Sequence, residues 1–94
     1  MAKGLNRFRS DEHSTLSILL KKYDRTIRLD NMCEEYFGLN YETARKHAKK
    51  CILPISAFQL GDSQKLPWFV DTIELADHID KRAAQAKKQW DKFQ

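Results

Sequence analysis

The sequence has few cysteines, and their arrangement excludes two common ways of stabilising a small domain. Among 94 residues there are two cysteines, Cys33 and Cys51, whereas a disulfide-rich domain of this size usually carries four or more. Neither cysteine forms a paired ligand spacing with His13, His47 or His78, so we expect no structural metal. We expect two reduced, buried thiols instead.

Long hydrophobic runs are absent as well. The longest apolar cluster, residues 16–20, is far shorter than the roughly 20 residues that cross a bilayer. No hydrophobic stretch follows the basic start, so we expect neither a signal peptide nor a membrane partner. The sequence also lacks a Ser, His and Asp arrangement, paired carboxylates beside a glycine-rich loop, and a phosphate-binding signature. It therefore predicts no enzyme, no cofactor and no small-molecule ligand.

What the chain does have is positive charge and enough apolar material for one core. It contains 17 Lys and Arg against 13 Asp and Glu, a net charge of +4, and 41% hydrophobic residues. A basic domain attracts polyanions, either nucleic acid or an acidic membrane. We interpret residues 1–9 as a flexible basic arm and residues 10–94 as one folded domain.

The first half of the chain has the pattern of two helices with an extended segment between them. A helix is expected from Ser10 or Asp11 to about residue 23, with an apolar stripe at helical spacing made of Leu16, Leu19, Leu20 and Tyr23. Residues 26–29 alternate and are β-branched, which favours an extended segment. Asp30 is expected to cap a second helix, and Gly38 to close it in left-handed conformation.

A third helix is expected to begin at Asn40, a good capping residue, and to reach about Cys51. Only Gly38, Leu39 and Asn40 separate it from the second helix. Two helices joined by a tight turn that contains glycine are typical of a helix-turn-helix. Extended runs at 55–60 and 67–71, with a polar turn at 61–65 between them, then predict a β-hairpin in the position of a wing.

The outer face of the third helix is the candidate DNA-reading surface. At about 100° per residue, one edge packs inward with Tyr41, Ala44, Ala48 and Cys51, and residues 41–51 carry a net +3 because Arg45, Lys46, Lys49 and Lys50 outnumber Glu42. The helix enters the major groove with its N-terminal half at the bases. The base-side candidates are Tyr41, Thr43, Arg45 and Lys46; the phosphate-side candidates are Lys49 and Lys50, and the capping residue Asn40 is counted with the DNA-binding set. A plain solvated face is the alternative interpretation.

The hairpin tip adds Ser63, Gln64 and Lys65, which suit phosphates or a minor groove, or else form an ordinary polar turn. The segment 68–70 is expected to anchor the hairpin in the core. Asp71, three residues before Glu74, predicts a capping box for a long last helix at about 72–93.

The last helix carries an apolar seam with alternating spacings of three and four residues, formed by Ala76, Ile79, Ala83, Ala86, Trp90 and Phe93. Small alanines allow close helix approach, and terminal aromatic residues are costly to leave in water. Two interpretations fit. The seam either joins two copies as a homodimer or higher oligomer, or folds back on the first helix.

Several segments occur together in an order that resembles the pyocin activator protein PrtN family over residues 16–85. They are Glu34-Glu35-Tyr36-Phe37-Gly38-Leu39, Leu53-Pro54, Asp62-Ser63-Gln64-Lys65, Trp68-Phe69-Val70 and Glu74-Leu75-Ala76-Asp77-His78-Ile79-Asp80. The resemblance implies a prophage-associated or phage-tail-associated activator of transcription, cytoplasmic and nucleoid-associated in bacteria, with double-stranded DNA and RNA polymerase as partners. It transfers no residue contacts.

The expected fold class is therefore α+β, mainly α with a small β-hairpin: a winged helix-turn-helix, excisionase-like, with a long C-terminal helix. Phage excisionases share this general pattern, and they bend DNA rather than activate transcription. A third hypothesis, from another class, is a module that binds or inhibits a host protein through the C-terminal seam, with the basic face serving only solubility.

Overall fold

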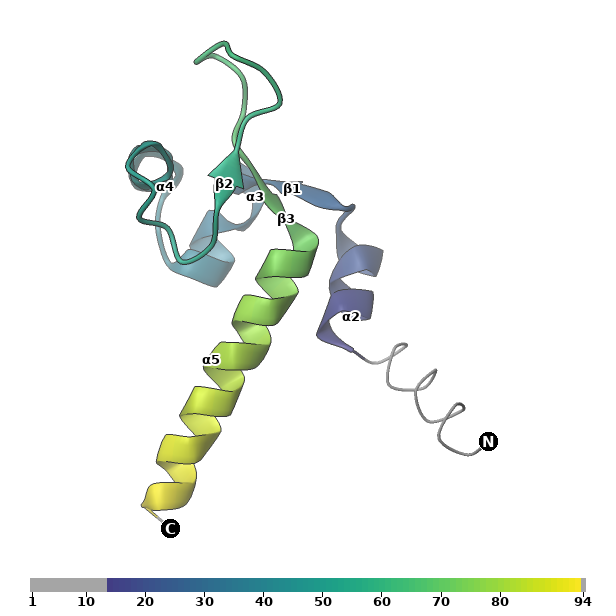
Figure 1. Cartoon of the computed structure of the whole chain (residues 1–94), viewed down its shortest axis with the longest axis vertical. Coiled ribbons are helices and arrows are strands. Elements are labelled where there is room, and N and C mark those ends of the chain that lie inside the picture. Colours follow the sequence, from purple (N-terminus) through teal and green to yellow (C-terminus); the bar gives the residue numbers. More distant parts are fainter. Residues whose placement is uncertain (1–13, 94) are drawn as a thin grey trace.

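The computed structural model describes residues 14–93 of the chain, and Figure 1 shows their arrangement. In chain order the elements are α2 (Thr15–Lys22), β1 (Thr26–Arg28), α3 (Leu29–Met32), the π-helical turn η1 (Cys33–Phe37), α4 (Tyr41–Lys49), β2 (Ala57–Phe58), β3 (Phe69–Asp71) and α5 (Thr72–Lys92). The predicted order of helices and extended segments is confirmed for this part of the chain.

A small antiparallel sheet lies at the centre of the fold, with strand order β1-β3-β2. Val70 in the middle strand pairs with Ile27 on one side and with Ala57 on the other. The expected hairpin is confirmed as β2 and β3, although β2 has only two residues. The sheet has a third strand because the extended segment after α2 pairs with β3. The chain is thus mixed α/β, as the expected α+β class requires.

The helices cover this sheet and enclose a single core. α2 and α5 lie side by side, and Thr15 Oγ1 donates a hydrogen bond of 2.6 Å to Asp80 Oδ1 across them. Buried hydrophobic side chains come from every helix and from β1 and β3: Leu19, Ile27, Leu29, Met32, Cys33, Ala44, Ala48, Val70, Leu75 and Ala76. Within residues 14–93, no helix combines the length and the apolar composition that crossing a membrane requires.

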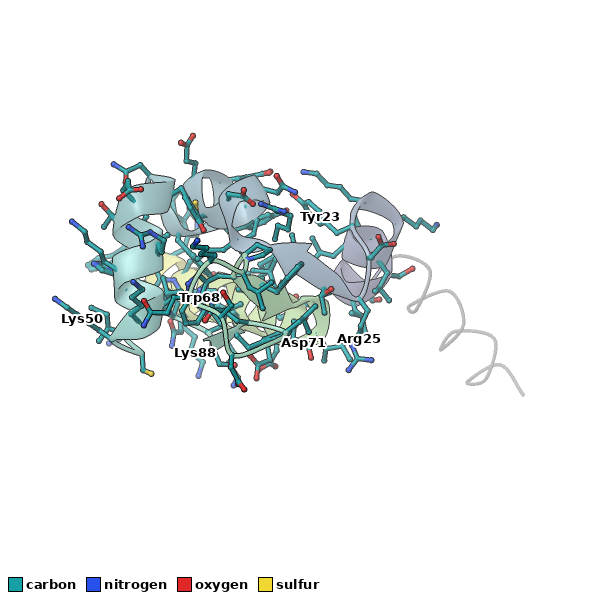
Figure 2. The ribbon with its side chains drawn as sticks, turned by 90° about the horizontal axis from the view of Figure 1, so that it is seen from above. Tyr23, Arg25, Lys50, Trp68, Asp71 and Lys88 are labelled. Carbon is teal, nitrogen blue, oxygen red and sulfur yellow. The ribbon has the colours of Figure 1, made fainter. Side chains whose placement is uncertain are left out.

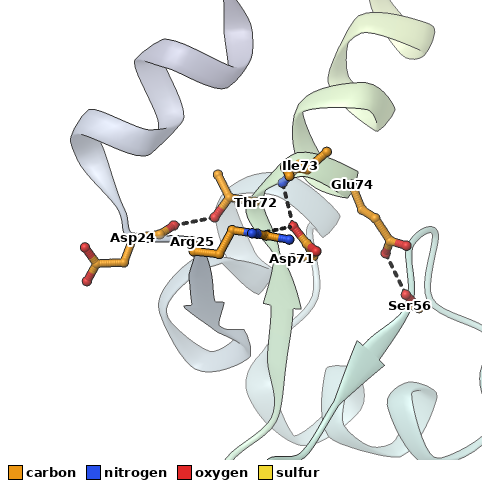
Figure 3. Close-up of polar contacts among 7 residues, drawn as sticks. All are labelled: Asp24, Arg25, Ser56, Asp71, Thr72, Ile73 and Glu74. Atoms are coloured by element: carbon orange, nitrogen blue, oxygen red, sulfur yellow. Dashed lines mark hydrogen bonds and ion pairs between the residues drawn. The ribbon is translucent and has the colours of Figure 1, made fainter.

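The junction between β3 and α5 ties the two halves of the fold together (Figure 3). Thr72 is fully buried; its amide donates to the Arg25 carbonyl (3.0 Å) and its hydroxyl to the Asp24 carbonyl (2.5 Å). Asp71 caps α5 by accepting from the Ile73 amide (2.8 Å) and also lies 3.5 Å from Arg25 Nε. The link from α2 to β1 is therefore fastened directly to the start of α5.

The predicted cap of α5 at Asp71 is confirmed, but the second half of the capping box is wrong. Glu74 does not turn back to the start of the helix. Its Oε2 accepts a 2.6 Å hydrogen bond from Ser56 Oγ in the segment before β2. A tertiary partner has replaced the local one, because the chain that leads into β2 passes close to the first turn of α5.

Two other predicted helix starts differ from the structure. α2 begins at Thr15, and Ser14 caps it by accepting from the Ser17 amide at 3.1 Å; residues 1–9, Ser10 and Asp11 lie outside the described residues. Asp30 is not a cap, because the helix already begins at Leu29, whose amide donates to the Trp68 carbonyl at 2.8 Å. The hydrogen bond to Trp68, just ahead of β3, thus sets the start of the helix.

Cys51 was expected on the inward edge of the third helix, and it is exposed. The helix ends at Lys49, and Cys51 takes a left-handed backbone conformation with φ of 58°. The helical phase that would have turned its side chain inward is therefore lost. Cys33 is buried as expected, and burial raises the pKa of its thiol. Leu20, assigned to the apolar stripe of α2, is exposed as well.

The hydroxyl of Thr72 offers a direct test of the junction. Thr72→Val keeps the shape of the side chain but leaves the Asp24 carbonyl without its donor, so we expect a loss of about 1–2 kcal/mol in the free energy of unfolding. Thr26→Val is the matched control, since Thr26 is only half-buried and its side chain has no hydrogen bond within residues 14–93. Urea denaturation measures both, and equal midpoints for the two variants would contradict the assigned role.

Candidate nucleic-acid interface

The start of α4 is fixed by local backbone chemistry on both sides of a short turn. Gly38 has a φ of 67°, the left-handed region that favours glycine, and its amide donates to the Glu34 carbonyl at 3.2 Å. Asn40 Oδ1 accepts from the Thr43 amide at 2.8 Å and so caps α4. Both predicted caps are confirmed. They set the direction in which α4 leaves the body of the protein.

One side of α4 is held against the core by small residues. Ala44 is fully buried and Ala48 nearly so. Two alanines on the inner face let the helix backbone approach α3 and η1 closely. Tyr41 is half-buried against the same core. Of the four residues expected on the inner edge, three are thus confirmed and only Cys51 is not.

The opposite face of α4 is polar and positively charged. Lys46, Lys49 and Lys50 are exposed, and Figure 2 shows Lys50 at the outer edge of the molecule, directed away from the body. Arg45 is partly covered, and its Nη2 lies 3.2 Å from Oε2 of Glu42, one turn earlier. Positive side chains in the last turn of a helix also complement its dipole.

Elsewhere in residues 14–93, four of the ten cationic side chains outside residues 41–51 form ion pairs with carboxylates. The ion pairs are Lys22–Glu35, Arg25–Asp71, Arg28–Asp30 and Lys81–Asp77. The hydrogen bonds from Arg28 lower the pKa of Asp30. Outside residues 41–51 this part of the chain holds ten Lys and Arg and ten Asp and Glu, so its formal charge is balanced. Lys46, Lys49 and Lys50 add positive charge to that balance, and they form no ion pair with any residue from 14 to 93. Their charge is therefore available to a partner.

The loop between β2 and β3, residues 59–68, is braced from within. Gln59 Nε2 donates to the Leu66 carbonyl at 2.7 Å and to the Ser63 carbonyl at 3.4 Å. Ser63 Oγ in turn accepts from the Lys65 amide at 3.2 Å. Gln64 and Lys65 are exposed at this loop, as expected for its tip. No local pattern around Gln59 predicts this bracing role.

The predicted site residues fall on two separate parts of the molecule. Figure 1 shows α4 and the β2–β3 loop at the end of the fold opposite the C-terminal end of α5. The predicted seam on α5 divides: Ala76 and Ile79 pack on the core, whereas Ala83, Ala86, Trp90 and Phe93 are exposed. Folding back on α2 thus describes only the first half of the helix.

The chemistry available at this surface is the binding of anions by the cationic face of a capped helix. Within residues 14–93, no group of three His, Cys, Asp or Glu side chains is placed to hold a metal ion.

Comparison with known proteins gave one family: the model described as "Pyocin activator protein PrtN" matches residues 15–86. No curated protein and no solved structure matches the chain.

The cap of α4 can be tested through stability alone. Asn40→Ala removes the acceptor of the Thr43 amide, and we expect the free energy of unfolding to fall by about 1 kcal/mol. Asn40→Asp retains an acceptor and is expected to remain close to the wild-type value. Thermal and chemical denaturation compare the two. Equal destabilisation by both substitutions would show that the cap does not hold the helix.

Proposed function

Because the chain belongs to the pyocin activator protein PrtN family, we propose that it is a regulator that binds double-stranded DNA at specific sequences. Its targets are phage- or prophage-associated genes of the pyocin type, and its role is activation. The observation that supports DNA binding is the face of α4, where Lys46, Lys49 and Lys50 stand exposed without ion-pair partners among residues 14–93.

The arrangement of elements supports a winged helix-turn-helix. The helical segment formed by α3 and η1 is followed by a turn at residues 38–40 and then by α4. In this class of fold the second helix lies in the major groove and the hairpin behind it contacts the backbone or minor groove. We assign α4 to the first role and the β2–β3 loop to the second.

Roles along α4 follow from its direction. Thr43, Arg45 and Lys46 lie toward the start and middle of the helix and are proposed to meet base edges. The Arg45–Glu42 ion pair is exposed to water, and such pairs contribute little to stability, so Arg45 can exchange it for a guanine. Asn40 and Tyr41 have structural tasks already, which limits their share in reading.

Lys49 and Lys50 are proposed to contact phosphates, together with Gln64 and Lys65 of the loop. Each phosphate contact releases counterions, so its contribution weakens as salt increases. The Ser63 hydroxyl oxygen accepts from the Lys65 amide, which orients it while its O–H can still donate to a phosphate. The loop is braced by Gln59 and can therefore present its exposed side chains without first becoming ordered.

The two proposed roles predict different defects. Lys49→Ala/Lys50→Ala is expected to weaken binding to every duplex and to reduce the slope of log K against log salt by about 2. Arg45→Ala/Lys46→Ala is expected to reduce the preference for a specific duplex, obtained by selection from a random library, over a scrambled duplex by about 1–3 kcal/mol. Fluorescence anisotropy over a salt series measures both quantities.

Lys21→Ala/Lys22→Ala on α2 is the matched control, because it removes the same formal charge from another part of the surface. Its salt slope should remain near the wild-type value. If this control reduces the slope as much as the α4 variants do, the binding depends on net charge and not on α4.

The architectural alternative, an excisionase-like protein that bends DNA, has one observation in its favour. Leu60, in the loop after β2, is 71% exposed. Apolar side chains inserted between base pairs are a common means of kinking a duplex. An exposed leucine on a braced loop beside a cationic surface fits that use.

Circularly permuted duplex fragments test this alternative in gels. If Leu60 acts as a wedge, Leu60→Ala should lose most of the bend while largely keeping affinity, and Ile18→Ala, an exposed apolar residue on α2, should keep both. If the gel mobility of the wild-type complex is the same wherever the binding site lies along the fragment, the protein does not bend DNA. That result would remove the alternative.

A further inference from the structure

The C-terminal half of α5 carries apolar surface that the body of the protein does not cover. Figure 1 shows that α5 continues beyond the N-terminal end of α2. On this free part, Ala83, Ala86, Trp90 and Phe93 share one face of the helix, and we call them the C-terminal stripe. Trp90 is 70% exposed and Phe93 is 90% exposed. Ala86, Trp90 and Phe93, with Gln89, border an open hollow on this face.

The order of sizes within the stripe points to its occupant. Two small residues are followed by two large ones, at spacings of three, four and three residues. If a second α5 runs antiparallel, Ala83 lies opposite the partner's Phe93 and Ala86 opposite the partner's Trp90. Every layer then joins a small side chain to a large one. A parallel pair would set ring against ring and alanine against alanine, which cannot pack at one interhelical distance.

We propose that the C-terminal stripe binds the same stripe of a second copy, in antiparallel orientation about a two-fold axis. The surface available is adequate for a weak dimer. A fully enclosed aromatic side chain buries roughly 150–250 Å². Because Trp90 and Phe93 are 70% and 90% exposed, the four rings of a dimer supply on the order of 500–800 Å². The alanines and the stems of flanking side chains bring the total close to the roughly 1,000 Å² that a specific interface needs.

The charges beside the stripe affect the affinity of the two copies for each other. Lys87 flanks the stripe on one side and Gln89 on the other. In the antiparallel arrangement, Lys87 of one copy meets the partner's Lys87 near the two-fold axis. Like charges oppose association, and salt screens them. The dimer should therefore become tighter as salt rises, which is the opposite of the salt dependence of DNA binding.

This inference extends the proposed function, because two joined copies would present two α4 helices to an inverted repeat in DNA. Its test needs no DNA, so the two ideas can fail separately. A monomer that binds a specific duplex would overturn only the dimer. A dimer without affinity for duplex DNA would overturn only the proposed function.

Sedimentation equilibrium of the full chain, over a concentration series reaching the high micromolar range, is the primary experiment. We expect a monomer–dimer equilibrium that tightens between about 0.1 M and about 1 M salt. Trp90→Ala should weaken it by more than about tenfold, whereas Ile73→Ala, an exposed residue in the first turn of α5, should leave it unchanged. Lys87→Gln should tighten it roughly two- to fivefold, and Lys88→Gln, on the opposite face, should not.

Orientation is tested by oxidation in a Cys51→Ser background, which removes the exposed native thiol. Gln89→Cys should form an intermolecular disulfide across the two-fold axis, and Gln85→Cys on the outer face should not. The proposal is overturned if the chain stays monomeric throughout the concentration series, including the case in which other residues of the same chain cover the stripe. A dimer unaffected by Trp90→Ala, or one cross-linked equally well at both positions, overturns it too.

Discussion

Pairing of β3 on both edges is the constraint on which the other parts of the structure depend. Val70 is fully buried and pairs with Ile27 on one side and Ala57 on the other. The same short strand leads directly into α5 through Thr72, and its neighbour Trp68 accepts from the amide that begins α3. A loop, a long helix and the helical segment ahead of α4 are thus oriented by a strand of three residues.

This arrangement explains how a small domain can present two surfaces without interference between them. α4 and the β2–β3 loop occupy one end, and the free half of α5 extends from the other (Figure 1). Outside residues 41–51, the ten Lys and Arg of residues 14–93 are matched in number by ten Asp and Glu. Four of these cations form exposed ion pairs, which contribute little to stability. The unpaired lysines of α4 consequently stand out against a nearly balanced background.

Features that depend on a few neighbouring residues could be predicted from the sequence. The caps at Asn40 and Asp71 and the left-handed Gly38 follow from local backbone chemistry, and all three are confirmed. The pairing of β1 with β3 could not be predicted, because its partners are more than 40 residues apart and neither strand carries a local signal of the other.

The errors have the same origin. Asp30 and Glu74 have the residue types of a cap and a capping box, but long-range hydrogen bonds from Leu29 and Ser56 decided the outcome. At Cys51 the prediction continued a helical phase that ends two residues earlier. The cationic face of α4 was predictable because a short helix with buried alanines fixes which side chains point outward. The partner of that face was not, since exposure alone does not identify what binds.

Selection of bound fragments from a random duplex library, using the full chain, tests the central claim most directly. The account predicts enrichment of one defined motif, which identifies duplex DNA as the partner of the protein and shows that sequence is read. Recovery of a library with no enriched motif would contradict it.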